Sequence, residues 1–434
     1  MIHIVSLGCQ SGKTGLAEDA NIFFLLLRGL KCETFVTKNR SLNAISLLLI
    51  IFIAGIILFR QKGIMKWSLE QEQALKAVGR WLAHRDSQVF RLFGYAGTGK
   101  TTLARHLAEG VEGKVLFGAF TGKAAHVLRQ KGCEGAATLH SLIYRPTGTN
   151  EEEDDDGKEQ PLFALRRDAP ASEAALIIID ECSMVDEELG RDLLSFRVPV
   201  LVLGDPAQLP PVKGGGFFTE HAPDVMLSEV HRQAKDNPII RLSMEVREGR
   251  ELDYGAYDTT EIIRRSDIDP QRILETDQVL VGMNRTRRLY NNRIRELLGY
   301  RDWQPAAGEK LVCLRNDKKK GLLNGGTWSI AALRTPRKGL LRLDVEPEDD
   351  LLARKVAVTV LPEFFQGNYD DLPYAKRRRS DEFDYGYALT VHKSQGSQWD
   401  DVVLFDESRA FREHRDRWLY TGITRAAETL TLVR

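Results

Sequence analysis

Cysteine is scarce in this chain, and the few cysteines form no recognisable ligand or disulfide pattern. The 434 residues include five cysteines, none of which lies in a CxxC pair. An odd number of scattered cysteines excludes a disulfide framework and argues against structural zinc or an iron–sulfur cluster. The pattern favours a reducing compartment, and we therefore expect a cytoplasmic protein.

Net charge is also absent, because 61 lysines and arginines are balanced by 61 aspartates and glutamates. No global positive field marks the chain as a nucleic-acid binder, although a local basic groove in a neutral protein is sufficient for that role. Hydrophobic residues make up 43% of the chain and charged residues 28%, which is typical of a globular protein and not of a disordered one. At about 150 residues per domain, the length indicates about two to four domains.

One long hydrophobic run interrupts this globular pattern. Residues 42–59 contain no charge, and 18 residues in a helix just reach the hydrocarbon thickness of a bilayer, which is about 30 Å. Two interpretations remain open. Either the run is an anchor that tethers the protein to a membrane, or residues 1–64 are not part of the working protein. We favour the second, because the sequence from Met65 onward reads like the start of a separate domain.

From Trp67 onward, short apolar segments alternate with helical patterns, which is typical of parallel sheets covered by helices. The strands expected from these segments are residues 89–93, 115–119, 175–179, 198–203, 278–281, 402–405 and 430–433. Between residues 303 and 384 the pattern changes to short β runs separated by turns, such as 310–314, 327–331 and 356–360. We predict an α/β protein with one parallel-sheet domain at 65–225, a second at 226–302 and 385–434, and a small β-barrel-like insert at 303–384.

The strongest chemical signal is a glycine-rich turn between a predicted strand and a predicted helix. Residues 94–101 read GYAGTGKT and match the phosphate-binding pattern GxxxxGK[ST]. In such a turn, backbone N–H groups surround phosphates, Lys100 reaches the β and γ oxygens of ATP, and Thr101 holds Mg²⁺. The nucleotide-binding residues predicted here are Gly94, Gly97, Thr98, Gly99, Lys100, Thr101 and Thr102. A similar turn at residues 8–14 is one residue too short, and we interpret it as accidental.

A second half of the same site is expected at the end of the apolar run 176–179. Asp180 and Glu181 follow that run directly. In this position Asp180 would bind Mg²⁺, and Glu181 would polarise the attacking water.

The ordered set of motifs resembles superfamily-one helicases, most closely the 5′→3′ branch with its RecD-like and Dda-like members. The resemblance covers residues 67–434 and rests on the segments DECSMV (180–185), GDPAQLPPV (204–212), LSEVHRQ (227–233), YALTVHKSQGSQ (387–398) and YTGITRA (420–426). It implies two tandem RecA-like domains. It also implies that Gln71 reads the adenine edge, that Gln208 senses the γ-phosphate, and that Arg232 and Arg425 act as arginine fingers. Gly396 is included among the nucleotide-binding residues on the same basis.

The resemblance also implies contacts to the phosphate backbone of DNA, which need hydroxyl, amide and basic groups and do not read base sequence. The residues concerned are Thr121, Lys123, Thr138, His140, Thr390, His392 and Lys393. The basic run 376–379 either extends this groove or is a solvated turn, and we favour the turn. Residues 141–174 stand where the family carries a strand-separating hairpin, but this segment is short and includes the acidic run 151–156.

These motifs predict a monomeric, ATP- and Mg²⁺-dependent helicase that moves 5′→3′ on single-stranded DNA and acts at duplex junctions. No small-molecule substrate other than ATP is expected. Three alternatives share the same motifs: a nucleic-acid-stimulated ATPase that remodels complexes without unwinding, an RNA helicase, and a membrane-tethered motor.

Overall fold

The computed structural model describes residues 67–149, 161–210, 216–230, 236–317, 319–348, 355–367, 369 and 372–434. Trp67–Arg434 cluster as one compact unit. The hydrophobic run 42–59, the turn at 8–14 and the acidic run 151–156 lie outside the described residues. Within the part that the structure describes, no helix is both long enough and apolar enough to cross a membrane.

The first sheet contains six strands, and every neighbouring pair in it is parallel. Their order across the sheet is β3 (Ala137–Thr138), β2 (Val115–Ala119), β6 (Leu176–Asp180), β7 (Val200–Gly204), β1 (Val89–Gly94) and β8 (Val225–Leu227). Four of the strands are almost wholly buried, which explains why they read as continuous apolar runs in the sequence.

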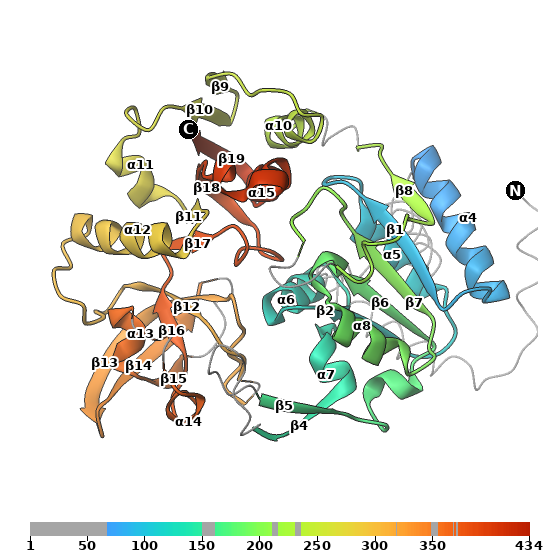
Figure 1. Ribbon diagram of the computed structural model, residues 1–434, viewed down its shortest axis with the longest axis horizontal. Coiled ribbons are helices and arrows are strands. Elements are labelled where there is room, and N and C mark those ends of the chain that lie inside the picture. Colours follow the sequence, from blue (N-terminus) through green and yellow to red (C-terminus); the bar gives the residue numbers. More distant parts are fainter. Residues whose placement is uncertain are drawn as a thin grey trace, which may run out of the picture. The chain divides into compact units, whose positions relative to one another are not determined.

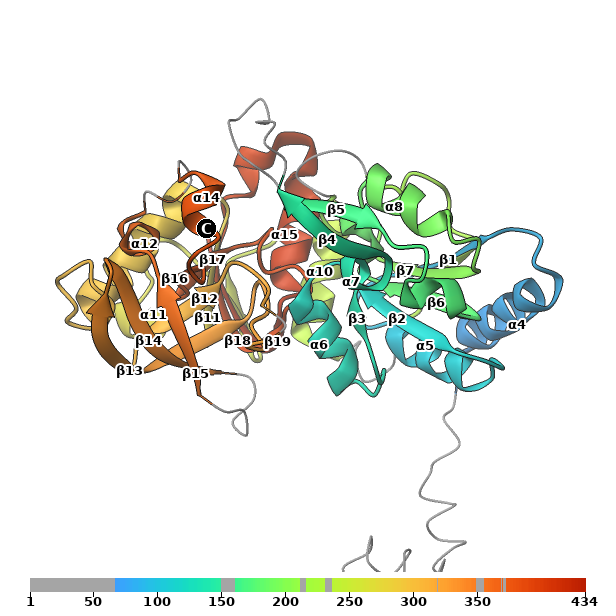
Figure 2. The same cartoon turned by 90° about the horizontal axis from the view of Figure 1, so that it is seen from below.

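Helices cover both faces of the first sheet, because successive side chains of each strand point to opposite faces. One core joins Leu92 and Leu203 to α4 (Leu69–His84), α5 (Lys100–Glu109) and α6 (Gly122–Gln130). The other core joins Phe93 and Val202 to α7 (Leu139–Ile143) and α8 (Glu187–Leu194). Figure 2 shows the sheet between these two groups of helices.

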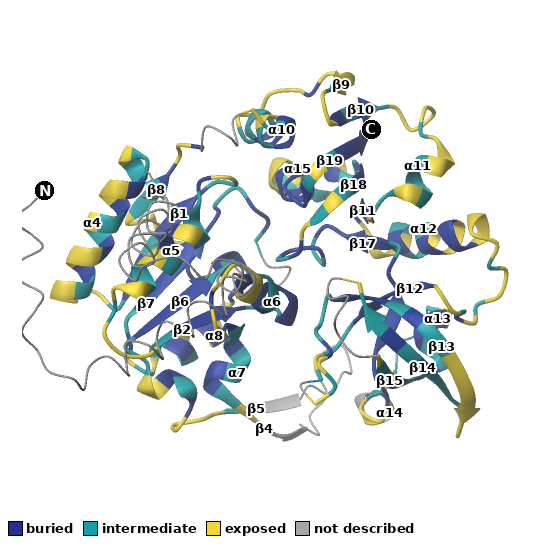
Figure 3. Cartoon of the chain, turned by 180° about the vertical axis from the view of Figure 1, so that it is seen from behind, coloured by how far each residue is buried: buried dark blue, intermediate teal, exposed yellow. Residues whose placement is uncertain are grey.

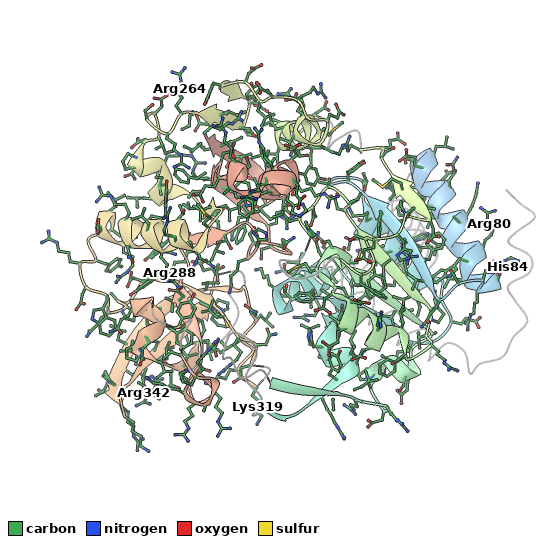
Figure 4. All side chains as sticks on the ribbon, viewed as in Figure 1. Arg80, His84, Arg264, Arg288, Lys319 and Arg342 are labelled. Atoms are coloured by element: carbon green, nitrogen blue, oxygen red, sulfur yellow. The ribbon has the colours of Figure 1, made fainter. Side chains whose placement is uncertain are left out.

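Helix α4 begins at a capping box, in which Ser68 and Gln71 each accept a hydrogen bond from the other's backbone N–H. Its inner side is buried on the sheet, whereas Arg80 and His84 lie on its exposed side and are labelled in Figure 4.

The second sheet also has six strands, parallel except at one edge, where the pair β10–β9 is antiparallel. Their order is β17 (Ala388–Thr390), β11 (Gln278–Val281), β18 (Trp399–Phe405), β19 (Ala426–Val433), β10 (Thr260–Ile263) and β9 (Gly255–Tyr257). One face carries α10 (Pro238–Arg247) and α15 (Arg415–Ile423), and the other carries α11 (Pro270–Glu275) and α12 (Asn284–Leu297) (Figure 1). The predicted α/β fold class is confirmed.

Between α12 and β17 the chain forms a five-stranded antiparallel sheet with its own apolar core. Its strands, in order, are β15 (Val356–Val360), β14 (Leu340–Pro347), β13 (Thr327–Arg337), β12 (Lys310–Cys313) and β16 (Phe383–Tyr385), and two short helices, α13 (Pro362–Gln366) and α14 (Tyr374–Arg377), lie between β15 and β16. A single bridge from Val360 to Asp381 brings β15 beside the chain entering β16, so the sheet curls toward closure. We refer to residues 303–384 as the β-insert.

Short elements complete the described chain. A hairpin of β4 (Tyr144–Thr149) and β5 (Pro161–Leu165) lies in the segment where a wedge was expected, and three 3₁₀ helices are η2 (Pro170–Glu173), η3 (Cys182–Met184) and η4 (Ser408–His414).

Several details differ from the sequence-based expectation. The strands β3, β9, β10, β16 and β17 were not among those expected, and the boundary between residues 384 and 385 cuts through β16. The boundary between residues 225 and 226 cuts through β8, which pairs with β1 and so belongs to the first sheet. Strand β14 was not among the expected strands, although Leu341, Leu343 and Val345 alternate with Arg342, Asp344 and Glu346 as in a half-exposed strand. As Figure 3 shows, β14 is partly exposed whereas the strands of the two parallel sheets are largely buried.

Two buried ion pairs fasten the β-insert to α12. The Arg295 guanidinium donates to both carboxylate oxygens of Glu309, at 2.6 and 3.1 Å, and the Glu309 side chain is 0% exposed. Arg287 on the same helix donates to Asp384 at 2.7 Å, and both side chains are buried. Burying such charges is tolerated only when each is paired, so these contacts fix the insert to the second sheet.

Glu309→Ala is expected to lower the free energy of unfolding by about 3–5 kcal/mol, because it leaves the Arg295 guanidinium buried and unpaired. Urea denaturation of the full chain measures this change. Glu296→Ala is the matched control, since it removes an exposed partner of Arg293 on the same helix and should change stability little. Equal losses for the two variants would contradict a specific role of the buried pair.

Candidate active site

The glycine-rich turn at residues 94–101, here called the phosphate loop, joins the end of β1 to the start of α5. Gly97 and Gly99 adopt φ angles of 77° and 79°, a left-handed conformation that glycine adopts without steric cost. A side chain on Gly94 would lie 2.7 Å from Thr98 Oγ1 and 2.8 Å from Leu227 Cβ, so this position also has no room for one. The loop therefore needs its glycines for both conformation and close approach.

Polar groups of the phosphate loop meet the end of β6. Thr101 Oγ1 donates to Asp180 Oδ2 at 2.8 Å, and the Lys100 ammonium donates to the carbonyls of Gly94 and Tyr95 at 2.6 and 2.9 Å. A hydroxyl and a carboxylate side by side are oxygen ligands of the type that Mg²⁺ prefers.

Glu181 follows Asp180 in a strained backbone conformation, with φ 55° and ψ 45°. Burial raises the pKa of its carboxyl, while the nearby Arg425 and Lys100 oppose that rise. A carboxyl whose pKa is raised is better matched to accepting a proton near neutral pH than an ordinary glutamate is.

The end of β7 contributes Asp205 and Gln208 to the same region. Asp205 is 4% exposed and accepts hydrogen bonds from the Ala207 N–H at 3.0 Å and from the Tyr420 hydroxyl at 2.7 Å. Burial raises the pKa of Asp205, and Lys100 is the largest opposing influence. Gln208 is buried, and its Oε1 atom has no hydrogen-bond partner among the described residues. A buried amide oxygen of this kind calls for a polar partner in the cavity that it lines.

Gln71 is positioned by two separate contacts. Its Oε1 atom accepts from the Ser68 N–H at 3.0 Å in the helix cap, and its Nε2 atom donates to the Thr98 carbonyl at 3.0 Å. The start of α4 is thereby joined to the phosphate loop.

Arg425 comes from the second sheet, at the start of β19. It is buried, and its guanidinium donates to the Thr421 and Ser397 carbonyls, both at 3.1 Å, and to Thr424 Oγ1 at 3.3 Å. These contacts aim the guanidinium into a cavity of about 460 Å³ that is shared with the first sheet. The lining comprises Tyr95, Ala96, Gly97, Gly99, Lys100, Thr101, Thr102, Lys131, Asp180, Glu181, Gly204, Asp205, Gln208, Gln398, Thr424 and Arg425.

Five predicted nucleotide-site residues are not found in this lining: Gln71, Gly94, Thr98, Gly396 and Arg232. Gly94 and Thr98 belong to the phosphate loop itself, and Gln71 donates to the Thr98 carbonyl. Gly396 lies against α6 instead, where a Cβ atom would be 2.8 Å from Ala124 Cβ, and its φ of 76° also favours glycine. Close approach between the two sheets therefore explains Gly396 better than phosphate binding does. Arg232 lies outside the described residues.

The predicted DNA-binding residues divide between the two sheets. Thr121 and Thr138 cap α6 and α7, and their hydroxyls accept from the Ala124 and Ser141 N–H groups. Thr390 ends β17, and its hydroxyl accepts from the Lys393 N–H. The residues 390–396, here called the 390–396 loop, approach α6 at Gly396, so the structure brings these two groups together.

The two predicted histidines are partly buried against aromatic rings. His140 lies between Phe120 and Tyr144, with ring centroids 6.0 and 5.7 Å away, and His392 lies 5.3 Å from Phe411. Burial lowers the pKa of both imidazoles. Both rings are therefore uncharged at neutral pH and would contribute hydrogen bonds and packing instead of charge.

Lys123 lies where two cavities meet, and it lines both of them. One, of about 610 Å³, lies between α6, α7 and the β-insert, and Thr138, Arg129 and Lys320 also line it. The other, of about 850 Å³, carries Asp277, Glu346, Glu348 and Asp400. The first cavity thus suits a polyanion better than the second. Burial lowers the pKa of Lys393, with Arg287 adding to that effect.

Sequence reasoning assigned no role to several residues that contact the nucleotide-sized cavity. Asp205 lies inside a quoted motif, but its residue type alone does not indicate that it lines the cavity. Tyr420 also lies inside a quoted motif and reaches this region through its hydrogen bond to Asp205. Gln398 and Lys131 likewise become candidates only because the fold brings them to the cavity.

Comparison with known proteins gives two matching families. The AAA domain family matches residues 68–267, and the UvrD-like helicase C-terminal domain family matches residues 385–433. The ATP-dependent RecD2 DNA helicase of Deinococcus radiodurans is 30% identical over 392 residues, which are 83% of this chain and 48% of that protein. These matches are consistent with the RecD-like and Pif1-like superfamily-one helicases. Members of this P-loop family use a nucleotide.

Other relatives share less of the sequence. The ATP-dependent DNA helicase Pif1 of Bdellovibrio bacteriovorus is 24% identical over 362 residues, covering 72% of this chain and 76% of that protein. A solved structure of Pif1 helicase from Bacteroides in complex with ADP-AlF3 and single-stranded DNA superposes with a TM-score of 0.51 at 18% identity, covering 85% of this chain and 92% of that one. That likeness shows the fold. The chain spans about half the length of the RecD2 relative.

Lys100→Ala and Glu181→Gln are expected to separate nucleotide binding from hydrolysis. The first removes the ammonium that is expected to reach the phosphates and should abolish both. The second keeps the shape of the turn, so nucleotide should still bind while turnover falls by about 10²–10⁴-fold. Binding of a fluorescent ATP analogue and release of phosphate measure the two steps. Lys114→Ala, which removes an exposed lysine near Glu173, is the control, and wild-type turnover by Glu181→Gln would contradict the assignment.

Proposed function

We propose that this chain is an ATP-dependent DNA helicase motor that translocates 5′→3′ on single-stranded DNA and unwinds duplex ahead of it. The observation that carries the proposal is the shared cavity, in which the phosphate loop of the first sheet faces Arg425 of the second. A site built from two sheets opens and closes as the sheets move, and such motion is how ATP turnover can advance a protein along a strand. The matches to helicase families support the same activity.

The residues present fit ATP and Mg²⁺. Lys100 and the loop N–H groups would hold the phosphates, and the paired Thr101 and Asp180 oxygens would hold the metal, which neutralises charge between the phosphates. Gln208 would donate from its amide Nε2 to the γ-phosphate, and Gln71 would lie at the adenine edge.

Hydrolysis would then depend on two groups from opposite sides of the cavity. The raised pKa of Glu181 suits it to take a proton from the attacking water. Arg425 would stabilise the charge on the transferring phosphoryl group with a planar guanidinium that stays protonated. We assign the same role to Arg232.

We also propose the residue groups that bind DNA and the division of the chain. Thr121, Lys123, Thr138 and His140 would grip the strand from one RecA-like domain, and Thr390, His392 and Lys393 from the other. The first domain would run through Leu227, the second would comprise 228–302 and 385–434, and the β-insert would form a separate module. A monomer is sufficient for this arrangement, because one chain supplies both halves of the cavity.

The proposal is tested with the full chain on duplexes that carry a single-stranded tail at one end. ATP-dependent strand separation is expected with a 5′ tail and not with a 3′ tail, and phosphate release should rise with single-stranded DNA. RNA tails of the same sequence distinguish an RNA helicase from a DNA helicase, because a preference for RNA requires contacts to the 2′-hydroxyl.

Each remaining outcome points to a stated alternative. Unwinding from a 3′ tail alone would overturn the polarity but keep the helicase assignment. DNA-stimulated hydrolysis without strand separation would favour an ATPase that moves or remodels complexes. No hydrolysis at all would overturn the proposal.

DNA affinity is expected to fall as the pH rises above about 8. Burial lowers the pKa of Lys123 to about 8, Glu348 opposes this shift, and Lys310 adds to it. Below that pH the ammonium is charged and can hold a phosphate. Above it the DNA-free protein loses the charge, so DNA binding must take up a proton and the affinity falls. Fluorescence anisotropy with a labelled oligonucleotide, at constant ionic strength between pH 7 and 9, measures this change.

Lys123→Arg is the control, because a guanidinium stays charged over that range and should flatten the dependence. Identical pH profiles for the two proteins would show that Lys123 does not supply the titrating charge.

A further inference from the structure

One hydroxyl group lies at the junction of the two sheets. Tyr420, on α15, is 1% exposed, and its Oη atom accepts from the Ala96 N–H of the phosphate loop at 2.9 Å. The same Oη donates to Asp205 Oδ2 at 2.7 Å. A single atom on α15, a helix that packs on the second sheet, thus bridges two loops of the first sheet that line the nucleotide cavity.

The neighbours of Tyr420 extend this connection. Thr421 Oγ1 accepts from the Leu209 N–H at 2.9 Å, and the Thr421 carbonyl accepts from Arg425 Nε at 3.1 Å. Residues 205–209, here called the 205–209 loop, are therefore hydrogen-bonded to α15 at both ends. Because α15 is a continuous helix directly before Arg425, a shift of α15 moves Tyr420 and Arg425 together.

The same loop is bonded to the proposed DNA-binding segment. Gln395 Nε2 donates to the Leu209 carbonyl at 3.0 Å, and Gln395 is buried. Gln395 lies in the 390–396 loop, next to Lys393. An uninterrupted chain of contacts thus runs from the 390–396 loop through Gln395, the 205–209 loop and Tyr420 to Ala96.

The Tyr420 hydroxyl is suited to remain a hydrogen-bond donor to Asp205. Burial and the nearby Asp205 carboxylate raise its pKa well above the usual value, so the hydroxyl remains protonated over the working pH range. A hydrogen bond from a hydroxyl to a buried carboxylate is stronger than one between neutral groups. We therefore expect the hydrogen bond between Tyr420 and Asp205 to persist when the surrounding loops shift slightly.

We propose that the Tyr420 hydroxyl is a positioning group that couples DNA binding to ATP turnover, by holding the phosphate loop and Asp205 in register with Arg425. This inference rests on the proposed function, since it names how that same site is controlled. The test separates coupling from simple stabilisation of the fold.

Tyr420→Phe in the full chain removes the hydroxyl and keeps the ring. Its kcat for ATP at saturating single-stranded DNA is expected to fall about tenfold, which corresponds to about 1.4 kcal/mol, with KM for ATP little changed. The control is Tyr385→Phe, which removes a similarly buried hydroxyl that donates to the Trp303 carbonyl in the β-insert. Tyr385→Phe should keep the wild-type kcat, and the melting temperatures of the two variants should fall by similar amounts.

A double-mutant cycle gives the second measurement. Asp205→Asn keeps the shape of the acceptor and weakens it, so Tyr420→Phe should slow an Asp205→Asn protein much less than it slows the wild type. Gln395→Ala, which cuts the path on its DNA side, should lower the stimulation by DNA in the same way.

Three results would overturn the inference. These are a wild-type kcat in Tyr420→Phe, additive effects in the cycle, and a loss of kcat accompanied by a much lower melting temperature than in Tyr385→Phe. Each of them leaves the proposed function intact if the wild type still hydrolyses ATP in response to DNA. A wild-type protein without DNA-stimulated hydrolysis would instead overturn both.

Discussion

Parallel strand direction in the first sheet is the constraint on which the rest of the structure depends. Because β1, β6 and β7 run the same way, their carboxyl ends meet at one edge, where each strand ends in a loop of polar residues. The phosphate loop, the pair Asp180–Glu181 and the 205–209 loop are distant in sequence but share that edge. The chemistry is therefore assembled by the sheet, while the helices on its two faces bury the apolar surface that keeps the strands aligned.

This edge alone is an incomplete site. Arg425 and Tyr420 reach it from the second sheet, and both are buried. Their contacts differ in kind. The Arg425 guanidinium is held by its own half of the protein and points into the cavity, whereas the Tyr420 hydroxyl is bonded directly to the opposite half. The Arg425 guanidinium is thus available for a phosphate, whereas the Tyr420 hydroxyl joins the two halves of the protein directly.

The sequence predicted those parts of the structure that depend on neighbouring residues alone, namely the phosphate loop and the buried parallel strands. The pattern of residues 94–101 needs only glycines at fixed positions between a strand and a helix, and apolar runs are enough to indicate buried parallel strands. Contacts between distant segments gave no such signal. Nothing in the sequence indicates that Tyr420 bonds to Ala96 and Asp205, or that Gly396 faces α6 instead of the phosphates. The strand β14 was missed although its charged and apolar residues alternate as in a half-exposed strand. The predicted domain boundary cut through β8 because a strand of three residues gives little local signal.

The chain enters and leaves the β-insert through two adjacent strands of the insert's own sheet. Its first strand, β12, pairs with its last, β16, and Val312 lies opposite Asp384. A segment whose two ends emerge side by side can be lengthened, exchanged or removed during evolution without changing the path of the surrounding chain. The hairpin of β13 and β14 lies at the far end of this module, with exposed residues near its turn. That turn is consequently a natural attachment point for a fluorescent reporter, since a dye there would follow the rotation of the second sheet without touching either the nucleotide cavity or the strand path.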